Sequence, residues 1–320
     1  MELLFTEAWG KIMAASRILI VPDKRVDGDS LGSSLALADI LIQEGKQVVV
    51  LVSELVPPLY QFLPHLSLCT QDVSKAKALN PDLIISFDCS DAPYIESLRP
   101  SFPPGVLLIN VDHHATNSRY GDLNLVDEKA PATAELLYRL LNYVRQKISP
   151  PAALCLLAGI GFDTSLLRNS NTNEASFRMI ADLVRLGGRL PVIQQALTKS
   201  HSVASLRLWG LAFDRLHEHK PFGFISTFIT RADLALADVD EEEVGGLSNF
   251  LKFVLNIDTL LVLRENQAGG VSCSMRSSHR DVSLIARAFG GGGHTRAAGF
   301  TVEKAKIHQL PDGSHRIERF

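Results

Sequence analysis

The chain has 320 residues, of which 46% are hydrophobic and 21% are charged, so it can bury a sizeable core and is not an intrinsically disordered polymer. Its formal net charge of −3 at pH 7 argues against a protein that coats long nucleic acid through bulk electrostatic attraction. No apolar run reaches the roughly 20 residues that a membrane-spanning helix needs. The four cysteines form no CxxC pair and are typical of buried thiols in a reducing compartment. We therefore expect a cytoplasmic protein without a membrane segment.

The first half of the chain alternates apolar runs of strand length with segments of helical spacing. Continuous apolar runs are typical of parallel strands that are buried on both faces, and helices between them are typical of α/β domains. The expected strands are Arg17–Val21, Val48–Val52, Leu83–Phe87 and Val106–Val111, and the expected helices are Leu31–Glu44, Ala132–Gln146, Pro151–Gly161 and Asn173–Leu186. This pattern predicts a doubly wound, mainly parallel sheet domain over residues 1–190.

The character of the sequence changes after residue 190. Residues 191–221 are more polar and mostly helical in spacing, and we interpret them as a connector. The remaining residues, 222–320, predict a smaller α/β domain. Its expected strands are Phe222–Thr230, Thr259–Arg264 and Val271–Met275, and its expected helices lie near Val244–Leu255 and over Asp281–Phe289.

Acidic residues and histidines follow three of the expected strands and one expected helix. These residues are Asp23, Asp27 and Asp29 after the first strand, Asp88 after LIISF, Asp112, His113 and His114 after VLLINV, and Asp163 in GIGFDTS. A single Asp in such a place is often only a turn residue or a helix N-cap. Independent turn residues do not, however, predict Asp or His at every one of these ends. Because the carboxyl ends of parallel strands share one edge of a sheet, the pattern predicts a common binding site.

The residue types in this set predict a metal centre. Carboxylates with one or two imidazoles and no thiolate suit a hard or borderline divalent cation. Manganese is favoured, with magnesium, cobalt and iron as alternatives. The number of ligands exceeds what one ion normally uses, so we expect two ions about 3.5–4 Å apart. Such a pair activates a water molecule for attack on a phosphoryl group.

Four motifs in the first half and two in the second carry a family resemblance. The motifs are DGDSLGSSLAL, DCSD, DHH and GFDT, followed by SMRSS and DVSLIARAFGGGGHTRAAG. In this order they resemble the DHH phosphoesterase superfamily with its DHH-associated C-terminal domain. The length is most similar to the subfamily of short-oligoribonuclease and 3′-phosphoadenosine-5′-phosphate phosphatase enzymes.

The resemblance implies a role for each metal ligand. Asp27 would bind the first ion and Asp29 the second, with Asp88 bridging the two. His113 and Asp163 would complete the second site.

The resemblance also implies two catalytic residues and one departure from the family pattern. Asp112 would orient a ligand without binding metal itself, and His114 would face the scissile phosphate as a hydrogen-bond donor or acid. The family usually has a His four residues before its first motif Asp, where this chain has Asp23. Asp is a competent ligand for manganese or magnesium, so a working first site and a weakened one are both open.

The second domain contains a local excess of arginine and histidine over residues 271–300. The resemblance assigns part of this region to binding the terminal phosphate and nucleotide of the substrate. The residues of this predicted clamp are Arg276, Ser277, Gly291, Gly292, Gly293 and His294. We interpret the glycine run as a loop that lets a phosphate or base approach closely.

The sequence thus predicts a two-metal phosphodiesterase or exoribonuclease with its active site in the cleft between two domains. Its expected substrates are short RNA or DNA oligonucleotides or dinucleotides, which it would cut to 5′-mononucleotides, with 3′-phosphoadenosine-5′-phosphate as a candidate second substrate. One alternative is a phosphodiesterase for cyclic di-AMP or its linear product pApA. Another is a catalytically weak nucleotide sensor, suggested by Asp23. A homodimer is left open.

Overall fold

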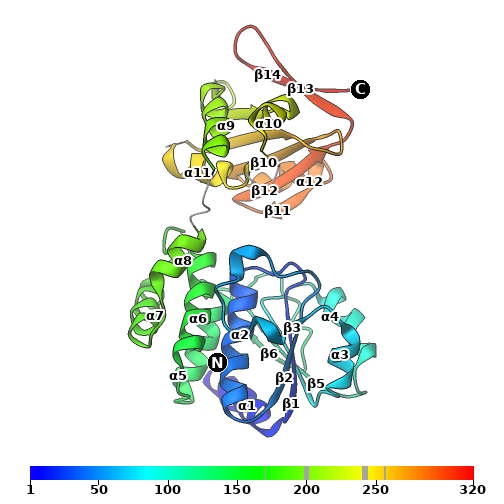
Figure 1. Ribbon diagram of the computed structural model, residues 1–320, viewed down its shortest axis with the longest axis vertical. Helices are drawn as coiled ribbons and strands as arrows, with labels where there is room; N and C mark the ends of the chain where they lie inside the picture. Colours follow the sequence, from blue (N-terminus) through cyan, green and yellow to red (C-terminus); the bar gives the residue numbers. More distant parts are fainter. Residues whose placement is uncertain (170, 198–201, 240–243, 256) are drawn as a thin grey trace. The chain divides into compact units, whose positions relative to one another are not determined.

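The computed structural model describes residues 1–169, 171–197, 202–239, 244–255 and 257–320 (Figure 1). The chain forms two compact units, residues 1–198 and 199–320. Within the described ranges, no helix combines the length and the apolar character that crossing a bilayer requires.

The first unit is built on a six-stranded sheet in which all neighbouring strands run parallel. The strand order is β3-β2-β1-β4-β5-β6. The strands are β1 (Arg17–Pro22), β2 (Gln47–Leu51), β3 (Cys69–Thr70), β4 (Leu83–Phe87), β5 (Leu107–Asp112) and β6 (Leu123–Val126). The predicted mainly parallel sheet is therefore confirmed. The short strands β3 and β6 were not predicted from the sequence.

The central strands bury side chains on both faces of the sheet. In β1, Ile18 and Ile20 join the larger hydrophobic core, whereas Leu19 and Val21 join a second core on the other face. This alternation explains why these strands are continuous apolar runs in the sequence. The helices of the larger core lie on one side of the sheet in Figure 1, and α3 and α4 lie on the other.

Eight helices longer than one turn are described in the first unit. They are α1 (Glu2–Ala14), α2 (Gly28–Gln43), α3 (Val73–Ala78), α4 (Ala92–Leu98), α5 (Thr133–Tyr143), α6 (Pro150–Asp163), α7 (Glu174–Arg185) and α8 (Leu190–Leu197). Helix α2 begins three residues earlier than predicted because Asp27 acts as its N-cap and forms a capping box with Ser30.

The second unit contains a mixed six-stranded sheet with the order β11-β12-β10-β9-β8-β7. Its strands are β7 (His217–His219), β8 (Phe224–Ile229), β9 (Thr259–Glu265), β10 (Val271–Ser277), β11 (Gly292–His294) and β12 (Ala297–Val302), and a separate hairpin is formed by β13 (Ala305–Gln309) and β14 (His315–Arg319). Strands β8 and β9 pair in parallel, and the other neighbours pair antiparallel.

Helices cover both faces of this second sheet. Helices α9 (Val203–Asp214), α10 (Arg231–Ala237) and α11 (Leu247–Val254) share a core with Leu260 and Val262. Helix α12 (Val282–Ala288) packs on Met275 and Ala298, which face the other way.

Two predictions about the second half need correction. Within the stretch interpreted as a helical connector, His217–His219 form strand β7. This polar segment has no strand pattern of its own and is extended because its backbone pairs with β8. Residues 198–201 of the stretch lie outside the described part. The glycine run is not wholly a loop, since Gly292 and Gly293 belong to β11. A Cβ on Gly293 would lie 2.6 Å from the Ala297 carbonyl oxygen, so this close pairing requires glycine.

Candidate metal centre

Most of the candidate metal ligands lie at or just after the carboxyl ends of β1, β4 and β5, which are neighbours in the first sheet, and Asp163 ends α6. After β1 the chain goes to β2 on one side, and it later returns to β4 on the other. The strand order therefore reverses between β1 and β4, and in open α/β sheets ligands bind at such a reversal.

Asp27 and Asp29 lie at the start of α2 but in different environments. Asp27 is exposed, and its Oδ1 accepts hydrogen bonds from the backbone N–H groups of Asp29 and Ser30 at 3.1 and 2.9 Å. Asp29 is buried, and its carboxylate points to the start of α5. Burial, followed by the charges of Asp163 and Asp27, raises the pKa of Asp29 well above its ordinary value.

Asp88 follows β4 in the left-handed backbone region, with φ of 59°, a conformation that Asp tolerates better than most residues. Its Oδ1 lies 3.4 Å from His113 Nε2 and 3.5 Å from His114 Nδ1. Burial raises the pKa of Asp88 strongly, and the neighbouring charge of Asp29 adds to this effect.

Asp112 ends β5 and organises the two histidines that follow it. Its Oδ1 accepts the backbone N–H groups of His113 and His114 and the Nδ1–H of His114 at 2.8 Å. Burial opposes ionisation, but these bonds from His114 and one from the Asn117 amide hold the pKa of Asp112 below its ordinary value. The same bond from Nδ1 raises the pKa of His114 against the opposite effect of burial.

His113 presents its Nε2 to two carboxylates. Its Nδ1 lies 3.1 Å from the carbonyl oxygen of Ala130, which only accepts hydrogen bonds, so Nδ1 carries the proton. Its Nε2 lies 3.4 Å from Asp88 Oδ1 and 3.3 Å from Asp163 Oδ2. Histidine ligands of metals commonly have this arrangement, with the other nitrogen donating to a carbonyl or carboxylate.

These contacts fit a divalent cation. Among the described residues, two triads have donor atoms that all lie within 4.8 Å of one another: Asp88, His113 and His114, and Asp29, His113 and Asp163. A lone pair on His113 Nε2 that faces carboxylate oxygens is repelled unless a cation or proton lies between them. The raised pKa values of Asp29 and Asp88 reflect the same excess of negative charge, which a cation would relieve.

Asp23 and Asp27 belong to neither triad. The carboxylate of Asp23 accepts the backbone N–H of Arg25 at 2.9 Å and a hydrogen bond from the Cys89 thiol. Burial raises the pKa of Asp23. The first metal site of the sequence analysis thus stays a prediction.

The sequence analysis did not predict two residues that contact the centre. Thr133 bonds to both Asp29 and Asp88, and Asn117 donates to Asp112. Thr133 follows Ala132, which occupies the N-cap position of α5, so no capping pattern in the sequence marks it. Asn117 lies in a loop without any such pattern.

In the predicted clamp, the side chains of Arg276 and Ser277 already have hydrogen-bond partners within the second unit. Arg276 Nε donates to Asn249 Oδ1 at 2.8 Å, and burial lowers its pKa. The Ser277 hydroxyl oxygen accepts the backbone N–H groups of His279 and Arg280, so it holds a turn. The backbone of His294 pairs with Ala297, which pairs with Arg276 in turn. The side chain of His294 lies outside the described part of the structure.

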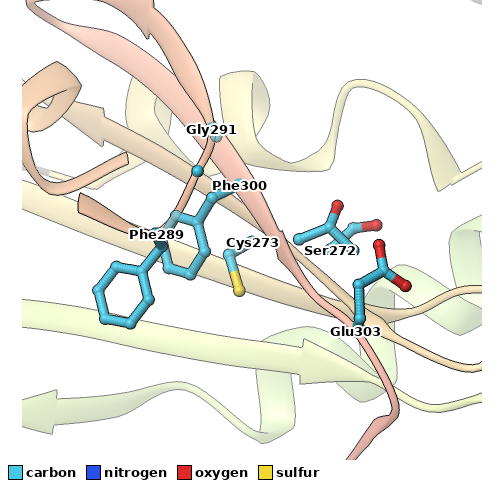
Figure 2. A pocket seen from close by; sticks show the side chains of 9 residues that line it. Ser272, Cys273, Phe289, Gly291, Phe300 and Glu303 are labelled. Atoms are coloured by element: carbon cyan, nitrogen blue, oxygen red, sulfur yellow. The ribbon is translucent and has the colours of Figure 1, made fainter. Parts of the chain in front are cut away.

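A pocket of about 600 Å³ opens on the second unit beside the glycine run (Figure 2). The rings of Phe289 and Phe300 stack there at 4.6 Å beside the thiol of Cys273. Cys273 and Arg276 are three residues apart on one strand, so their side chains point to opposite faces of the sheet. Since the charged residue that lines this pocket is Glu303, the pocket does not favour a phosphate.

Comparison with known proteins identifies the family. A family model for the DHH family, N-terminal domain, matches residues 17–160, and a model for the DHHA1 domain matches residues 227–320. A bifunctional oligoribonuclease and PAP phosphatase (NrnA) of Thermus thermophilus is 30% identical over 288 residues, which is 88% of this chain and 83% of that protein. The chain belongs to the DHH phosphoesterase family. It is a metal-dependent phosphoesterase, and its Asp/His triads are consistent with divalent metal ions.

Other DHH-family relatives are similar over nearly their whole length. A bifunctional oligoribonuclease and PAP phosphatase of Bacillus subtilis is 25% identical over 300 residues, and the match covers 93% of each chain. Among solved structures, an exopolyphosphatase-related protein from Bacteroides fragilis has a TM-score of 0.85 at 22% identity and covers 98% of this chain and 94% of its own. An exonuclease RecJ bound to manganese has a TM-score of 0.53 at 13% identity, with 95% and 90% covered. These two structures support the fold alone.

Proposed function

We propose that this DHH-family enzyme is a two-metal phosphodiesterase that hydrolyses short oligonucleotides or dinucleotides to 5′-mononucleotides. The observation that carries this proposal is the convergence of Asp29, Asp88, Asp163 and His113 at one edge of the parallel sheet. The substrate class is supported by the relatives named as oligoribonucleases, which match over most of their length. Their second named activity makes 3′-phosphoadenosine-5′-phosphate a second candidate substrate.

In this proposal Asp29, His113 and Asp163 would hold one ion, Asp27 would hold the other, and Asp88 would serve as a ligand to both. Asp23 would join Asp27 in place of the usual His. Manganese suits this oxygen-rich set, with magnesium, cobalt and iron as alternatives. When bound, the two ions activate water and neutralise charge that grows on the phosphoryl group.

His114 would act on the substrate rather than on a metal. Its Nδ1 is bonded to Asp112, which leaves Nε2 for the phosphate. The raised pKa of His114 keeps a larger fraction of the ring protonated near neutral pH. A protonated Nε2 donates a hydrogen bond to a phosphate oxygen or a proton to the leaving oxygen.

The second unit would recognise the nucleotide. Arginine binds phosphate through two parallel hydrogen bonds, and Asn249 already fixes the orientation of Arg276. We propose that Arg276 and His294 bind the terminal phosphate. The backbone of Gly291–Gly293 would lie beside it.

The test is a substrate panel with the full chain and manganese. The substrates are pApA, cyclic di-AMP, RNA of two to seven nucleotides and 3′-phosphoadenosine-5′-phosphate, and products are separated by chromatography. We expect mononucleotide release to be fastest from pApA and the shortest RNA. Asp88→Asn should lower the rate by at least about 100-fold, in the range seen when a major electrostatic contributor is removed. The Arg276→Ala change should mainly raise KM.

Two other outcomes would contradict the proposal, and each would favour a different function. Preferential cleavage of cyclic di-AMP would identify the cyclic dinucleotide phosphodiesterase instead. Tight nucleotide binding without turnover in manganese, magnesium and cobalt would favour a sensor, for which Asp23 in place of the usual His is the supporting observation.

A further inference from the structure

Helix α5 begins without a side-chain cap of its own. Its N-cap residue is Ala132, which has no group that accepts a hydrogen bond from the first turn. The first N–H groups of a helix need partners from outside the helix. Here Thr133 N–H donates to Asp29 Oδ2 at 2.6 Å and Ala134 N–H donates to Asp29 Oδ1 at 2.9 Å. The carboxylate of Asp29 therefore caps a helix that lies about a hundred residues further along the chain.

The side chain of the same Thr133 contacts a second candidate ligand. Its Oγ1 donates to Asp88 Oδ1 at 2.9 Å, and the residue is fully buried. Thr133 thus bonds to carboxylates from two different elements, the start of α2 and the end of β4. Hydrogen bonds to both carboxylates leave further lone pairs on their oxygens.

We propose that Thr133 is a positioning residue of the metal centre, which holds Asp29 and Asp88 together in the orientation that binds divalent cations. This inference rests on the proposed function. The two carboxylates repel each other in a buried environment, so they do not stay close unless donors and the positive end of a helix compensate. Thr133 supplies one donor to each. The ligands are then already in place when a cation arrives, which lowers the cost of binding.

A purely structural role for Thr133 predicts different behaviour. If the residue only started α5, its hydroxyl would affect stability and leave metal affinity unchanged. Thr133→Val removes the hydroxyl with little change of shape and keeps the backbone donor. Thr133→Ser keeps the hydroxyl. Thr227 provides the matched control, because it is fully buried and its Oγ1 donates to the carbonyl oxygen of Ala212 in the second unit.

The experiment is a calorimetric titration of metal-stripped full chain with manganese. We expect Thr133→Val to weaken binding by about 10–100-fold, the range typical of residues that support metal ligands. Thr133→Ser and Thr227→Val should stay within about threefold of the wild type. Thermal unfolding without metal checks that each variant folds, and Thr133→Ala replaces Thr133→Val if the latter does not.

Each contrary result has a distinct meaning. Wild-type affinity in folded Thr133→Val overturns the inference alone, as does equally weak binding by the Ser and Val variants, which would point to packing. A wild-type chain that binds no manganese overturns the proposed function and the inference with it.

Discussion

The surroundings of Asp29 and Asp88 disfavour the charged form of each carboxyl group. Both are buried, and each lies among other carboxylates that raise its pKa. Asp112 is equally buried but has a lowered pKa, because His114 and Asn117 donate to it. Asp29 and Asp88 are therefore carboxylates whose negative charge a cation would stabilise. Asp112 is instead stabilised by protein hydrogen-bond donors, and it holds His114 in place.

A second group of titratable residues, which includes His217 and His219 on β7 and His315 on β14, belongs to the second unit. The ring of His315 on β14 lies 4.9 Å from Phe228 and 6.1 Å from His219. Burial, and then the neighbouring His219 and His217, lowers the pKa of His315 to about 4. Its Nδ1 is buried without a hydrogen-bond partner among the described residues.

This arrangement predicts acid sensitivity. Since the pKa of His315 is lower in the folded chain than in the unfolded one, the unfolded state takes up more protons as the pH falls. The contribution of His315 to stability should be constant above about pH 6.5 and decline from there towards pH 4, by on the order of 1–2 kcal/mol once the partial exposure of the ring is discounted. Urea unfolding at pH 7 and pH 5 measures the effect. His315→Gln should reduce the decline.

The control for this prediction is His308→Gln on the same hairpin. His308 is half exposed and lies 3.5 Å from Glu318, so its removal should leave the decline in place. An identical pH dependence in wild type and His315→Gln would refute the role of His315.

At the scale of elements, glycines let α6 approach α2 and α5 closely enough to bring Asp163 to the centre. A Cβ on Gly159 would lie 2.4 Å from Ala134 Cβ and 2.7 Å from Asp29 Oδ1. A Cβ on Gly32 would lie 2.5 Å from the Cys155 carbonyl oxygen. The helices therefore pack backbone against backbone at this point, which only glycine permits.

We expect Gly159→Ala to destabilise the first unit by about 1–3 kcal/mol and to weaken manganese binding, because α6 must move away from Asp29. The matched control is Gly10→Ala in α1, where a Cβ would have no neighbour within 4 Å. Better helix propensity should make that variant more stable by about 0.5–1 kcal/mol. Urea unfolding compares the two. Equal or greater stability of Gly159→Ala would show that the helices have room to separate.

The elements with strong local patterns could be predicted from the sequence, and those defined by pairing could not. Runs such as Leu83–Phe87 are apolar on both faces and reveal buried parallel strands directly. The polar strand His217–His219 and the glycine strand Gly292–His294 have no such pattern and exist because neighbouring strands offer hydrogen bonds.

The same distinction holds for the candidate site. Asp88 and Asp112 could be proposed because each follows a recognisable strand. Thr133 could not, because its contacts with Asp29 and Asp88 join residues that are far apart in the sequence and meet only in the folded chain.

At the scale of the whole molecule, the parallel sheet of the first unit brings the ends of β1, β4 and β5 to one edge, and the similarity to DHH-family relatives extends over both units. The central claim is that this edge holds two divalent ions.

A manganese titration of the metal-stripped chain tests that claim most directly. We expect two ions per chain in the wild type, fewer than two in His113→Ala, and two in His308→Ala, whose side chain lies on the C-terminal hairpin. A wild type that binds no manganese, or a His113→Ala variant that still binds two ions with unchanged affinity, would contradict the account.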